Sequence, residues 1–74
     1  MRRYVPPHVR AALRAIGVEG SAGFHTVRKT YRRLMKQYHP DAVRHSDTEF
    51  RVAAETRTKE LNAAYRVLEE FYSE

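Results

Sequence analysis

Residues 27–41 read VRKTYRRLMKQYHPD, an amphipathic helical pattern followed at once by a stop signal. The apolar and aromatic side chains recur every three or four residues and fall in one sector about 100° wide. These side chains are Val27, Tyr31, Leu34, Met35 and Tyr38. The opposite sector carries five cations, namely Arg28, Lys29, Arg32, Arg33 and Lys36. Because Pro40 disfavours helical geometry in the residue before it, the stretch predicts a helix that ends at Tyr38.

A short helical segment precedes this stretch. Pro7 suits the first turn of a helix and Gly17 suits the position after its end, so a helix is predicted over residues 7–16. Ser21 is a favourable N-cap residue, which places the start of the central helix near residue 22.

A second long helix follows the central one. Ser46 and Glu49 match a capping box, in which each side chain satisfies a free backbone amide, and they predict a helix over residues 47–72. The sequence therefore predicts an all-α fold in which residues 22–38 and 47–72 form two long antiparallel helices. The loop over residues 39–46 lies at the tip of this hairpin. The short first helix packs against the two long helices.

Length and composition bound the class of protein. The chain has 74 residues and a mass of 8.7 kDa, which allows one small domain, predicted over residues 7–74 with residues 1–6 as an N-terminal arm. Cys is absent, which excludes disulfides, thiolate metal sites and cysteine nucleophiles, and the isolated His residues suggest no metal site and no cofactor. No run suits a membrane span or a signal peptide. We therefore expect a cytoplasmic monomer, either a whole small protein or one module of a longer chain.

Charge is distributed unevenly along the chain. Residues 1–40 contain nine Lys and Arg against Glu19 alone, a net charge of +8, whereas residues 41–74 contain five against eight acids, a net charge of −3. Such a chain presents a basic surface to an acidic partner, which composition alone leaves open as nucleic acid, membrane or protein.

Four segments together resemble the J-domain, the module of the DnaJ co-chaperone family. Residues 13–18 (LRAIGV) resemble the end of the first helix of that family, and residues 27–38 resemble its second helix without a gap. The tripeptide HPD at residues 39–41 matches the invariant tripeptide of the family, and residues 61–68 (LNAAYRVL) resemble its third helix. The tripeptide alone is a weak signal, but its position between these two helical patterns is highly specific.

The resemblance implies a domain that docks on a DnaK-type 70-kDa heat-shock chaperone and stimulates its ATP hydrolysis, without being an enzyme itself. The docking face would be the basic side of the second helix, formed by Arg28, Lys29, Arg32, Arg33 and Lys36. The ATPase-stimulating motif, called the trigger below, would be His39, Pro40 and Asp41. The core between the long helices would contain Val27, Tyr31, Leu34, Tyr38, Leu61, Tyr65 and Leu68. No catalytic residue and no metal ligand are implied.

The sequence departs from the family pattern after the tripeptide. Residues 42–46 lack the Lys/Arg-Asn pair that usually follows it, and Thr58 stands where the family usually has phenylalanine. We expect Phe50, about two turns earlier, to fill a related part of the core.

Nucleic-acid binding is the competing function. A helical domain with a pI near 10.0 and a basic helix is a fair electrostatic candidate. Against it, the basic face carries no Asn or Gln at base-reading positions, so no nucleic acid is expected as the partner.

Overall fold

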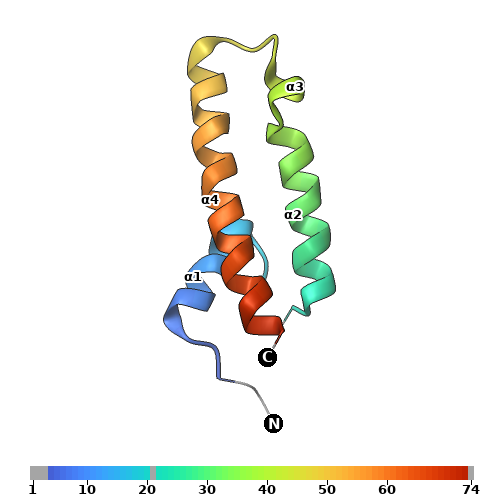
Figure 1. Cartoon of the computed structure of the whole chain (residues 1–74), viewed down its shortest axis with the longest axis vertical. Helices are drawn as coiled ribbons and strands as arrows, with labels where there is room; N and C mark the ends of the chain where they lie inside the picture. Colours follow the sequence, from blue (N-terminus) through green and yellow to red (C-terminus); the bar gives the residue numbers. More distant parts are fainter. Residues whose placement is uncertain (1–3, 21, 74) are drawn as a thin grey trace.

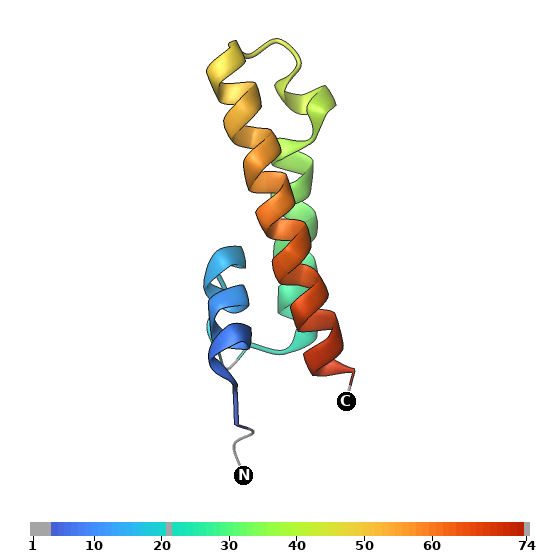
Figure 2. The ribbon, with the colours of Figure 1, turned by 60° about the vertical axis from the view of Figure 1, so that its left-hand side comes forward.

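The computed structural model describes residues 4–20 and 22–73, which form four helices and no β-strand. The helices are α1 (Pro7–Ile16), α2 (Phe24–Tyr38), α3 (Pro40–Val43) and α4 (Thr48–Tyr72). The long helices α2 and α4 run antiparallel, and α1 packs mainly on the C-terminal half of α4, away from the tip (Figures 1 and 2). The result is a rod of 48 × 20 × 17 Å. The predicted all-α hairpin is confirmed.

The central helix begins later than predicted. The structure starts α2 at Phe24 with Gly23 as its N-cap, rather than at residue 22. Aromatic packing explains this start, because the Phe24 ring lies 5.7 Å from the Tyr65 ring and 5.5 Å from the Tyr72 ring. Ser21, the N-cap that the sequence predicts, lies outside the described residues.

The predicted loop over residues 39–46 contains a helical turn of its own. In this turn, α3, the carbonyl of His39 accepts hydrogen bonds from the amides of Ala42 at 2.8 Å and Val43 at 3.2 Å. Proline suits the first turn of a helix because it has no amide hydrogen to leave unsatisfied, so Pro40 ends α2 and begins α3. The turn places Val43, which is buried, beneath the tip of the hairpin.

The last helix begins at Thr48, and the capping box predicted from Ser46 and Glu49 is wrong. The carboxylate of Asp47 accepts a hydrogen bond from the amide of Phe50 at 2.8 Å and caps the helix instead. Asp and Ser are comparably good N-caps, so the local sequence offered two adjacent candidates.

The core lies at the base of the rod, where α1, α2 and α4 meet. Val27, Leu61 and Leu68 are fully buried there. The first helix contributes four more buried side chains, namely Val9, Ala12, Leu13 and Ile16. Four residues of the expected core are only partly buried and pack against this cluster: Tyr31, Leu34, Tyr38 and Tyr65. Most of the stabilising burial therefore lies away from the tip.

Aromatic side chains join the two long helices along one edge. The rings of Tyr31 and Tyr65 stack with centroids 4.0 Å apart, and the Tyr31 hydroxyl donates to Oδ1 of Asn62 at 2.5 Å. Burial raises the pKa of the Tyr31 phenol, with the negative potential of Tyr65 and Glu69 adding to the shift. The phenol therefore stays protonated and remains a donor at neutral pH.

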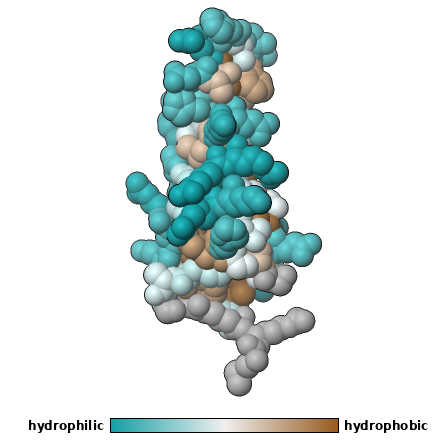
Figure 3. Space-filling model, turned by 90° about the vertical axis from the view of Figure 1, so that its right-hand side faces the viewer, coloured by the Kyte–Doolittle hydropathy of each residue, from teal (hydrophilic) through white to brown (hydrophobic). Residues whose placement is uncertain are grey.

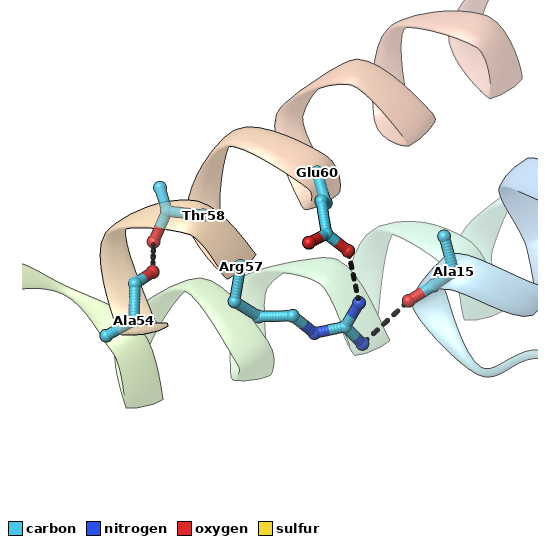
Figure 4. Close-up of polar contacts among 5 residues, drawn as sticks. All are labelled: Ala15, Ala54, Arg57, Thr58 and Glu60. Atoms are coloured by element: carbon cyan, nitrogen blue, oxygen red, sulfur yellow. Dashed lines mark hydrogen bonds and ion pairs between the residues drawn. The ribbon is translucent and has the colours of Figure 1, made fainter. Parts of the chain in front are cut away.

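The apolar stripe of α4 is interrupted at Arg57 and Thr58, whose side chains both donate hydrogen bonds to backbone carbonyls (Figure 4). Nη2 of Arg57 donates to the carbonyl of Ala15 at 2.7 Å, in the last turn of α1, and Nη1 lies 3.6 Å from Oε2 of Glu60. A cation is favourable there because the last carbonyls of a helix lack partners and carry partial negative charge. Oγ1 of Thr58 donates to the carbonyl of Ala54 at 2.9 Å.

Arg57→Ala should destabilise the domain by about 1.5–3 kcal/mol, the usual range for a hydrogen bond to a charged group. The matched control is Lys59→Ala, which breaks an exposed ion pair with Glu55 of 3.5 Å and should cost less than about 1 kcal/mol. Chemical denaturation of both variants measures the difference. Equal losses of stability would show that the contact with α1 contributes nothing.

Phe50 does not fill the core at the tip, so that expectation is wrong. Its side chain is 47% exposed, although it lies on the same helical stripe as the buried Ala54. The N-terminal end of α4 extends past the end of α2 (Figure 1), and Phe50 borders an open hollow that Tyr38 of α2 and Ala54 also line. Tyr38, Val43, Ala54 and Thr58 instead line a cleft of ≈ 560 Å³ beside α3.

None of the described helices combines the length and the apolar character that crossing a membrane requires.

Candidate docking face and tip motif

The five cations of the docking face are all exposed on α2. Arg28, Arg32 and Lys36 follow one another at four-residue spacing, about 6 Å apart along the helix axis. No residue in the described part of the chain forms an ion pair with any of the five. The side of the molecule on which α2 lies carries a broad band of hydrophilic side chains (Figure 3). This surface therefore presents positive charge that no described residue neutralises through an ion pair.

One cation of this face also contacts an aromatic ring. The guanidinium carbon of Arg28 lies 5.2 Å from the centre of the Phe24 ring. This cation–π contact restrains the side chain at the base of the docking face without removing its charge.

The three residues of the trigger are exposed at the tip, where the chain passes from α2 to α3. His39 has φ −57° and ψ 142°, which ends α2 and turns the chain sharply into Pro40. The backbone amide of Asp41 donates to Nδ1 of His39 at 3.1 Å. The carboxylate of Asp41 lies 3.8 Å from the same nitrogen at its nearer oxygen, and its side chain is 82% exposed. A carboxylate exposed to this degree is available to a cation on a partner.

The docking face and the trigger form one continuous surface. A shallow hollow of ≈ 330 Å³ lies between them and is lined by Met35, Lys36, His39, Asp41 and Ala42. The last cation of α2 and the carboxylate of the trigger therefore border the same depression. A partner that contacts one of them would also lie against the other.

Sequence reasoning missed α3 and the buried Val43. A one-turn helix has no periodicity to detect, and the available signal was Pro40 in a position suited to a helix start, with His39 able to cap it.

The site offers charge and hydrogen-bonding groups. Among residues 4–20 and 22–73, no group of three or more His, Cys, Asp or Glu side chains could hold a metal ion. The arrangement suits recognition of a macromolecule with complementary charge.

Comparison with known proteins identifies the class of domain. The family model described as "DnaJ domain" matches residues 14–71. Three relatives are each named chaperone protein DnaJ: that of Rickettsia bellii (strain RML369-C) is 44% identical over 55 residues, that of Roseiflexus sp. (strain RS-1) 42% over 53, and that of Rippkaea orientalis 40% over 55. These matches cover 72–74% of this chain and 13–14% of each relative. No solved structure matches the chain significantly.

The chain therefore belongs to the DnaJ domain family. The matched region includes the whole of α2 and α3 and nearly all of α4, and it begins within α1.

Proposed function

We propose that this domain acts as a monomeric co-chaperone module that docks on a DnaK-type heat-shock chaperone and stimulates its ATP hydrolysis. The observation that carries this proposal is the continuous exposed surface that runs from the cations of α2 to His39 and Asp41. Membership of the DnaJ domain family supports it. The functional unit extends from residue 7, because α1 supplies half of the main core.

The two parts of this surface have different roles. Five cations on one rigid helix orient an acidic partner and raise the association rate more than the final affinity. The trigger then binds one conformation of the chaperone better than the other and shifts it toward the state that hydrolyses ATP. The domain supplies no reacting group to this step.

Docking and triggering can be separated by reversing charge on α2. Arg32→Glu with Lys36→Glu removes four units of positive charge from the exposed docking face and leaves the core intact. The concentration for half-maximal stimulation of ATP hydrolysis should rise on the order of tenfold or more, because several exposed charge contacts are lost together. At saturation the variant should recover part of its stimulation, since the trigger remains. The measurement is single-turnover ATP hydrolysis by a DnaK-type chaperone, titrated at low and high salt.

The matched control reverses two exposed cations of α1, Arg10→Glu with Arg14→Glu. This variant has the same net charge but an unchanged docking face, and α1 packs mainly on α4 rather than on α2. Its titration should stay close to that of the parent, whose affinity should fall as salt rises. Equal effects of the two double variants, or an affinity that ignores salt, would contradict docking through α2.

A further inference from the structure

His39 lies at the junction of two helices. It is the C-cap of α2 and the N-cap of α3, and its carbonyl accepts the first backbone hydrogen bonds of the latter. Its imidazole folds over the same turn, so that Nδ1 accepts a hydrogen bond from the amide of Asp41 at 3.1 Å. The side chain of the first trigger residue therefore holds the backbone of the third.

This contact fixes the protonation pattern of the neutral imidazole. A ring nitrogen that accepts a hydrogen bond carries no proton, so the proton lies on Nε2. Nδ1 of His39 thus accepts a backbone amide hydrogen bond, as a side-chain oxygen of Asn, Asp or Ser does at an ordinary N-cap.

Asp41 has few other restraints. Among the described residues, its carboxylate accepts no hydrogen bond and its one ion-pair approach is that of Nδ1 at 3.8 Å, and its side chain is 82% exposed. The direction in which the carboxylate projects is therefore set by the backbone of α3, and that turn is closed at its N-terminal end by His39. Without the cap, the first turn of so short a helix opens readily.

We propose that His39 acts as a positioning residue, and that its role is to hold Asp41 through the acceptor Nδ1. This inference rests on the proposed function, since it concerns how the trigger is organised. The competing role is direct contact of the imidazole with the partner through Nε2.

Amide side chains distinguish the two roles. In His39→Asn the amide oxygen takes the place of Nδ1 and can cap α3, whereas in His39→Gln the amide group extends to the place of Nε2 and caps poorly. Both replacements are neutral and polar, and the site is exposed, so the fold itself should be retained.

The experiment measures ATP hydrolysis by the DnaK-type chaperone at saturating concentrations of each variant. His39→Asn should retain several times more stimulation than His39→Gln or His39→Ala, because Asn is among the best N-caps. His39→Gln and His39→Ala should lower it by about fivefold or more, the usual effect of losing one cap. The matched control, Asp47→Ala, removes the N-cap of α4 and should leave maximal stimulation close to that of the parent.

The outcomes separate this inference from the proposed function. Loss of stimulation in His39→Asn, with helical circular dichroism unchanged, would overturn the positioning role and assign the imidazole to the partner contact. Full activity of His39→Ala would overturn it too, because no cap would then be required. The arm that tests the proposed function is Asp41→Asn, which keeps the cap and removes only the charge.

A second measurement needs no chaperone. Nitrogen and proton NMR of the neutral His39 imidazole should show the proton on Nε2, and the amide of Asp41 should lose its hydrogen-bonded signature in His39→Ala but keep it in His39→Asn. A proton on Nδ1 of the parent would rule out the cap.

Discussion

Asp41→Asn should abolish stimulation of the chaperone ATPase at every concentration of the domain and at every salt concentration. The substitution removes one negative charge from a side chain that is 82% exposed and outside the core. Losing a charge-assisted hydrogen bond weakens contact with a cationic partner, and no excess of domain restores a contact that cannot form. Melting temperature and helical content should be unchanged, since substitutions at such positions alter stability by less than about 0.5 kcal/mol.

Asp47→Asn is the matched control for this result. It removes the same charge from the same connection, but Asn can still accept the amide hydrogen of Phe50 and cap α4. Its stimulation should equal that of the parent. Normal stimulation by Asp41→Asn would remove the trigger assignment. If nucleic-acid binding by the basic face were the function instead, neither substitution should change the affinity for nucleic acid appreciably.

Leu68→Ala should destabilise the domain by about 2–5 kcal/mol. Leu68 is fully buried and packs in the cluster that joins α1, α2 and α4. A domain of this size has only a few kcal/mol of net stability, so much of the population should unfold. Thermal and urea denaturation followed by circular dichroism measure the loss.

Val52→Ala provides the comparison within the same helix. Its side chain is 58% exposed, so its truncation should change stability by less than about 0.5 kcal/mol. Similar melting curves for the two variants would show that the stripe through Leu68 does not face the core.

Periodicity was sufficient to predict the long helices and their pairing. Val27 on the apolar stripe of α2 and Leu61 and Leu68 on the apolar stripe of α4 are fully buried, and the cations of the docking face are exposed. What periodicity could not show is how closely the chain packs near the tip. Phe50 shares its helical face with the buried Ala54, yet its own side chain is 47% exposed.

The helix ends were harder to predict because adjacent residues compete for the cap. Ser46 and Asp47 are comparable N-caps, and tertiary packing of Phe24 rather than cap chemistry explains the start of α2. The residues of the trigger could be named from their resemblance to a family motif. The hydrogen bond from the Asp41 amide to His39 could not, because it depends on the side-chain rotamer and on the one-turn helix that follows.

The distance between the core and the tip bears on how this domain can change through evolution. Many proteins trade stability against activity because their functional residues are strained or are buried without partners. Here no non-glycine residue of the described chain has a positive φ, and none of its buried side-chain polar atoms lacks a hydrogen bond. None of the exposed cations and none of the residues of the tip motif belongs to the main buried cluster. Under the proposed function, mutational drift on the docking face can therefore retune partner choice without bringing the fold closer to its unfolding threshold, and changes in the core can leave the docking face as it is.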